Sequence, residues 1–153
     1  MSRNRFRLGR GQRWWLHGTF TVLFLTGVVW WILHRWGGVE TDFGPTPHPW
    51  NPWLLRLHGA CAMVALVVLG TLLGGHVRAA WRAGRNRFTG AGMVAFCGGL
   101  VVSGYALYYV GSEMGRELAS WVHLGLGVAF PAVLIVHIWR GRHARRRSSG
   151  GRT

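Results

Sequence analysis

Long uncharged runs alternate with clusters of arginine along this chain of 153 residues. No Asp, Glu, Lys or Arg occurs in four runs, which cover residues 14–34, 57–77, 88–112 and 118–139. A helix needs roughly 20 apolar residues to cross the hydrocarbon core of a bilayer, and each run is long enough. The pattern therefore predicts an all-α fold, an integral membrane four-helix bundle.

The arginines are distributed unevenly between the two ends of these predicted spans. Five precede the first run, four lie between the second and the third, and six follow the fourth, so that fifteen fall on one side. The other side carries three arginines and all four acidic residues. The positive-inside rule predicts that both termini are cytoplasmic. This sorting accounts for the net charge of +14, so we expect membrane lipid and no nucleic acid as a partner.

The spans divide the chain into three predicted parts. These are a basic cytoplasmic arm at residues 1–13, a four-helix transmembrane domain at 14–140 and a basic cytoplasmic tail at 141–153. Within the domain, the second, third and fourth helices are predicted at residues 53–77, 88–110 and 118–139, the last kinked at Pro131. The first run ends in bulky aromatic residues rather than a small-residue cleavage site, so we expect it to remain in the mature protein.

Two connecting features complete this organisation. The segment GGVETDFGPTPHPWNP contains four prolines and is predicted to be an extended periplasmic loop, the natural docking surface for a partner. The third helix carries no histidine, and its Ala95, Gly99 and Ser103 form a stripe that is typical of helix packing. We therefore expect a structural role for the third helix.

Histidines are concentrated in the apolar runs, where ionisable side chains are rare and costly. Six of the eight lie within these runs or at their ends: His17, His34, His58, His76, His123 and His137. Because successive helices alternate in direction, His17, His76 and His137 are expected on the cytoplasmic side and the other three on the periplasmic side. Two layers of histidine result.

The spacing in the fourth helix suggests what these layers bind. His123 and His137 are 14 residues apart, which is close to four turns, so they share a face and lie about 21 Å apart. One helix can thus supply one axial ligand to each of two stacked haems, with an imidazole from another helix on the opposite face of each iron. The chain has no Cys-x-x-Cys-His motif, so two non-covalent haem b groups are expected.

We expect the second ligand of each haem to be a histidine that lies at the same depth on another helix. His58 is the expected partner of His123 in the periplasmic layer. In the cytoplasmic layer His17 lies four residues from Arg13, a depth similar to that of His137. His76 is an alternative ligand there, because it lies 18 residues from His58, five turns along the same face. If His76 is not a ligand, it is expected to contribute to a quinone site.

Three stretches carry a family resemblance: RWWLHGTFTVLFLTG from Arg13, LLRLHG at His58, and WVHLGLGVAFPAVLIVHIW in the fourth helix. They resemble the small four-helix dihaem cytochrome b superfamily, which includes the membrane cytochrome b subunits of formate dehydrogenase and nickel-iron hydrogenase and their short bacterial relatives. The resemblance implies that His17 pairs with His137, and His58 with His123, around haem b.

The expected function is that of a dihaem b membrane cytochrome in the bacterial cytoplasmic (inner) membrane. It would transfer electrons between a periplasmic redox protein and the quinone pool, as a subunit of a larger complex. Two alternatives remain open. One is a stand-alone quinone-coupled reductase or superoxide oxidase of the same fold, and the other is a haem-free membrane anchor or assembly subunit.

Overall fold

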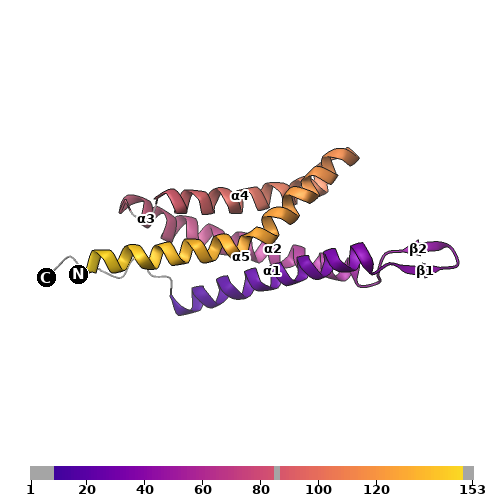
Figure 1. The fold of residues 1–153 in the computed structure, drawn as a ribbon, viewed down its shortest axis with the longest axis horizontal. Helices are drawn as coiled ribbons and strands as arrows, with labels where there is room; N and C mark the ends of the chain where they lie inside the picture. The colour runs from indigo at the N-terminus through magenta and orange to yellow at the C-terminus, as the bar shows by residue number, and fades with distance from the viewer. Residues whose placement is uncertain (1–8, 85–86, 150–153) are drawn as a thin grey trace. The chain divides into compact units, whose positions relative to one another are not determined.

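The computed structural model describes residues 9–84 and 87–149, and these are almost entirely helical (Figure 1). The elements are α1 (Arg10–Trp36), β1 (Val39–Thr41), β2 (Gly44–Thr46), α2 (Asn51–Leu72), the π-helical turn η1 (Leu73–Val77), α3 (Arg78–Arg82), α4 (Arg87–Tyr109) and α5 (Glu113–Ser149). The chain forms two compact units, one ending at Arg78 and the other beginning at Ala79.

Four helical segments in the described part of the chain are long and apolar enough to cross a membrane. They are Arg10–Trp36, Asn51–Arg82, Arg87–Tyr109 and Glu113–His143. Each overlaps one of the four uncharged runs, which confirms the prediction of an all-helical chain with four potential spans.

The first unit is a helical hairpin in which α1 packs against α2. The helix α1 ends where the N–H of Gly37 donates to the carbonyl oxygen of Leu33, at 2.9 Å. The helix α2 begins at Asn51 with Pro52 in its first turn, where the missing N–H of proline costs no helical hydrogen bond. Thr19, Thr26 and Ala65 are the buried residues on the facing sides of the two helices.

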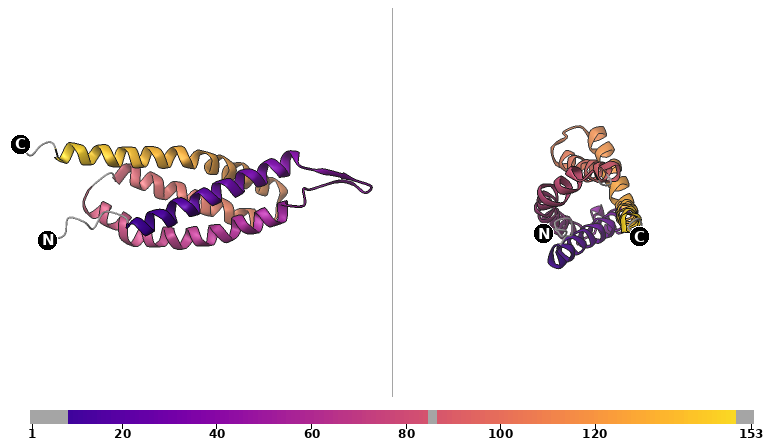
Figure 2. Two further views of the ribbon diagram at one scale, coloured as in Figure 1. Left: turned by 90° about the horizontal axis from the view of Figure 1, so that it is seen from below. Right: turned by 90° about the vertical axis from the view of Figure 1, so that its left-hand side faces the viewer.

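The connection between α1 and α2 contains a short β-hairpin, where the sequence predicts an extended loop. The strands β1 and β2 pair antiparallel, with Val39 opposite Thr46 and Thr41 opposite Gly44. The hydroxyl of Thr41 donates to the Gly44 carbonyl at 2.7 Å, and Gly44 adopts φ 101°, which glycine tolerates best. Figure 2 shows the strands projecting beyond the ends of α1 and α2.

The second half of the second span departs from a regular α-helix. Residues Leu73–Val77 form a π-turn that includes His76. A π-turn adds about one residue to a helical turn, so later residues are rotated by about 100° relative to an uninterrupted α-helix. The prediction that His58 and His76 share a face assumes a regular helix, and this turn interrupts the helix at His76.

The second unit is also a helical hairpin, in which α4 packs against α5. The rings of Phe96 and Phe130 are 6.4 Å apart between centroids. The helix α5 begins earlier than predicted because Ser112 caps it, its hydroxyl accepting from the N–H of Gly115 at 3.2 Å. It continues to Ser149 through the predicted basic tail, and Figure 1 shows it bending part-way along, as expected of a helix that contains Pro131.

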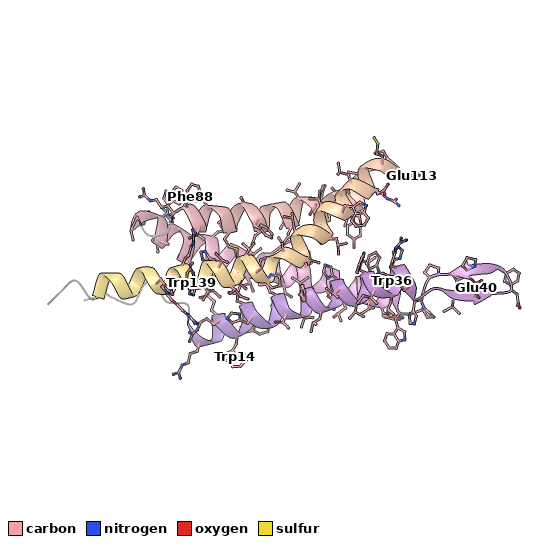
Figure 3. All side chains as sticks on the ribbon, viewed as in Figure 1. Trp14, Trp36, Glu40, Phe88, Glu113 and Trp139 are labelled. Atoms are coloured by element: carbon pink, nitrogen blue, oxygen red, sulfur yellow. The ribbon has the colours of Figure 1, made fainter. Side chains whose placement is uncertain are left out.

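Polar and apolar side chains are distributed in the opposite way to those of a water-soluble protein. Large apolar side chains are widely exposed, whereas the buried residues include Thr19, Thr26, Asn51 and Ser103. Exposed tryptophans mark helix ends, among them Trp14 and Trp36 at the two ends of α1 (Figure 3). Such a distribution is typical of helices that are surrounded by lipid and keep their polar groups between helices.

Candidate functional site

His58 contacts a hydroxyl of the neighbouring helix in the first hairpin. Its Nδ1 lies 3.0 Å from Oγ1 of Thr26. The same hydroxyl lies 2.7 Å from the carbonyl oxygen of Val22, one turn earlier in α1. Thr26 is buried and His58 is partly buried, so this contact lies between the two helices.

His123 has the same environment in the second hairpin. Its Nδ1 lies 3.0 Å from Oγ of Ser103, and that hydroxyl lies 2.7 Å from the carbonyl oxygen of Gly99, one turn earlier in α4. Ser103 is buried and His123 is partly buried. The third predicted helix, α4, therefore contacts a candidate ligand directly. The prediction of a structural role for this helix did not include that contact.

A glycine follows the hydroxyl residue in both hairpins and gives the histidine ring its space. A Cβ on Gly27 would lie 3.2 Å from Cε1 of His58, and a Cβ on Gly104 would lie 3.2 Å from Cε1 of His123. Both distances are shorter than ordinary van der Waals contact. The absence of a side chain at these two positions lets each ring lie against the backbone of the opposite helix.

The hydroxyl contacts bear on which nitrogen of each imidazole carries the proton. A carbonyl oxygen can only accept, so the short contact from Thr26 to Val22 uses the single hydroxyl proton. A hydroxyl that donates to Val22 accepts from Nδ1 of His58, which then carries the ring proton. A neutral imidazole with its proton on Nδ1 carries its lone pair on Nε2. The same reasoning applies to Ser103 and His123.

The remaining candidate ligands have different surroundings. His137 lies in α5, and its Nδ1 is buried without a hydrogen-bond partner in the described part of the chain. His17 in α1 is exposed, and His76 in the π-turn is partly buried. His34 stacks on Trp30 with ring centroids 4.7 Å apart, an arrangement suited to an interfacial histidine.

Two contacts between α1 and α2 fix the depths of His17 and His76. Gln12 donates to Thr71 at 3.4 Å, and Thr26 lies level with His58. His17 is nine residues from Thr26, or about 14 Å along the helix, and His76 is 18 residues from His58, or about 27 Å. Both of these separations differ by a similar amount from the separation of about 21 Å between His123 and His137. Depth alone therefore does not distinguish His17 from His76.

The predicted ligand pairs are divided between the two units. His17, His58 and His76 belong to the first, and His123 and His137 to the second. Each pair therefore remains a prediction, although the environment of each histidine within its own hairpin is defined.

The histidines offer donors of the kind that a haem iron takes from a protein. Among the described residues no three His, Cys, Asp or Glu side chains lie close enough together to hold a metal ion. A haem supplies four equatorial nitrogens itself and takes only axial ligands from the protein. In His58 and His123 one ring nitrogen contacts a hydroxyl, and a ligating histidine likewise has a polar partner on its second nitrogen.

The first hairpin also contains an apolar cavity of ≈ 450 Å³. Its lining includes Trp14, Trp15, Thr19 and Cys61. His76 is not among the lining residues, and the quinone site expected at His76 stays a prediction.

The signal that sequence reasoning missed is a repeated dipeptide. A hydroxyl residue followed by glycine occurs at Thr26-Gly27 and again at Ser103-Gly104, and each dipeptide faces a histidine of the next helix. No family model, curated protein or solved structure matches the chain.

Proposed function

We propose that this chain is a membrane cytochrome that holds two haem b groups and passes electrons between a periplasmic redox protein and the quinone pool. When bound, haem supplies a centre that accepts and releases single electrons. His58 and His123 are the proposed ligands of the periplasmic haem. His137 is the proposed ligand of the cytoplasmic haem, together with His17 or His76.

The observation that supports this proposal most is the matched environment of His58 and His123. Each imidazole has its Nδ1 3.0 Å from a buried hydroxyl, and a proton on Nδ1 leaves the lone pair on Nε2, the nitrogen that would bind iron. Two histidines with the same protonation pattern, in two different hairpins, are what two axial ligands require.

The membrane location proposed here rests on the surface and on the charges. Exposed apolar side chains cover the helices, and in water such surfaces would associate with one another. Fifteen of the 18 basic residues lie on one side of the spans, so we propose that both termini are in the cytoplasm. The bacterial cytoplasmic (inner) membrane is the proposed location.

An absorption spectrum tests the proposal against its alternatives. The purified full-length chain, reduced with dithionite, should show the bands of b-type haem. A pyridine haemochrome assay should give two haems per chain, removable by acid acetone because no covalent attachment motif occurs. A colourless protein would contradict the proposal and favour the haem-free anchor. Quinone reduction by the isolated chain would favour a stand-alone enzyme instead of a complex subunit.

A further inference from the structure

The two helical hairpins repeat one arrangement of three residues. In the first these are Thr26, Gly27 and His58, and in the second Ser103, Gly104 and His123. The distances from histidine Nδ1 to the hydroxyl oxygen are equal, at 3.0 Å. The distances from the hydroxyl to its carbonyl partner are also equal, at 2.7 Å. The added-Cβ distances at the two glycines are the same as well, at 3.2 Å.

The repetition extends along both pairs of helices. Ala65 and Phe130, each seven residues after its histidine, are both buried. The pattern of buried, partly buried and exposed positions along residues 54–72 is nearly the same as the pattern along residues 119–137. The two hairpins are therefore structural repeats, and the hydroxyl contact occupies the same place in each.

We propose that Thr26 and Ser103 are a matched pair of positioning residues that hold His58 and His123 as the Nδ1–H tautomer. Each hydroxyl donates its only proton to a carbonyl oxygen of its own helix. It therefore has only lone pairs to offer the imidazole. This fixes both the tautomer and the ring orientation. The tautomer is inferred from the contacts of each hydroxyl within its own hairpin, whereas its consequence for a haem ligand rests on the proposed function.

Nitrogen-15 NMR of the full-length chain tests the tautomer without any haem. The protein is labelled at histidine, produced without haem and held in detergent micelles, where the shifts of Nδ1 and Nε2 report which nitrogen carries the proton. We expect His58 and His123 to have the proton on Nδ1. Thr26→Val removes the acceptor, so the tautomer ratio at His58 should change by about fivefold while His123 is unaffected. Ser103→Ala should do the reverse.

Two further variants separate positioning from a general structural effect. Thr26→Ser keeps the hydroxyl and should keep the tautomer of His58. Thr19→Val removes another hydroxyl of α1 that is equally buried, at 7% exposure, and should leave both histidines unchanged. A proton on Nε2 of His58 in the unaltered protein would overturn the proposal, and so would an unchanged His58 in Thr26→Val. The unaltered protein decides the tautomer even if Thr26→Val does not fold.

The reduction potential of the haem-loaded chain gives the second measurement. A hydrogen bond donated from Nδ1 makes the imidazole a stronger ligand, which favours the oxidised iron. Thr26→Val should therefore shift the potential of one haem to a more positive value, and Thr19→Val should not. A chain without haem would contradict the proposed function, while the NMR result would still decide the role of Thr26. Haem with an unchanged potential in Thr26→Val would overturn the link between the hydroxyl and the ligand.

Discussion

His58 and His123 are each constrained from two directions by residues of the neighbouring helix. A hydroxyl lies 3.0 Å from Nδ1, and the backbone at a glycine lies against Cε1. These constraints act together, because a ring displaced from the glycine would have to lengthen its hydrogen bond to the hydroxyl. A small side chain added at Gly27 or Gly104 should therefore disturb the histidine ring more than the size of the added group suggests.

Replacement of Gly27 by alanine tests this coupling. The added Cβ would lie 3.2 Å from Cε1 of His58, and the ring cannot retreat without weakening its bond to Thr26. Overpacking of this kind costs about 1–3 kcal/mol, which outweighs the gain of up to about 1 kcal/mol for alanine over glycine within a helix. We expect a lower melting temperature by circular dichroism and a reduced haem content.

Gly18 provides the matched control, since it lies in the same helix and a Cβ there would meet nothing within 4 Å. Gly18→Ala should leave haem content unchanged and stability equal or slightly higher. Equal behaviour of Gly27→Ala and Gly18→Ala would show that the ring of His58 has more freedom than the structure indicates.

At the scale of helices and turns, the uncharged runs predict the spans well but not their irregularities. The third helix was expected at residues 88–110 and is observed at Arg87–Tyr109. The start of α5 was missed because a serine cap lies outside the apolar run. The π-turn Leu73–Val77 was missed because its apolar and glycine residues are also compatible with a regular helix.

The π-turn bears on the choice of the cytoplasmic ligand. The turn includes His76 and interrupts the regular helix between His58 and His76. We therefore expect His17→Ala to lose one of two haems, and His76→Ala to keep both, as measured by pyridine haemochrome per chain. His34→Ala serves as a control that should keep both, since its ring stacks on Trp30. Loss of a haem in His76→Ala, with both retained in His17→Ala, would place the cytoplasmic ligand on the second span.

At the scale of the whole chain, the sequence predicted four apolar helices and the histidines that they carry. It did not predict that two hairpins repeat each other. The reason is that few residues are identical between them: Thr26 corresponds to Ser103, and the buried Ala65 corresponds to Phe130. Such substitutions preserve a hydrogen bond or a buried position while changing the residue type, so the repetition becomes visible only through contacts and burial.

Thiol labelling tests the proposed orientation of the chain in the membrane. Phe43 at the tip of the β-hairpin is fully exposed, and the hairpin belongs to the side with three of the 18 basic residues. Phe43→Cys should therefore react with a membrane-impermeant thiol reagent in intact cells. Thr153→Cys should react only after the cells are permeabilised, because fifteen basic residues hold that side in the cytoplasm. The unaltered protein, with Cys61 and Cys97 in its apolar helices, is the control. Labelling of Thr153→Cys in intact cells would reverse the orientation and exchange the sides assigned to the two haems.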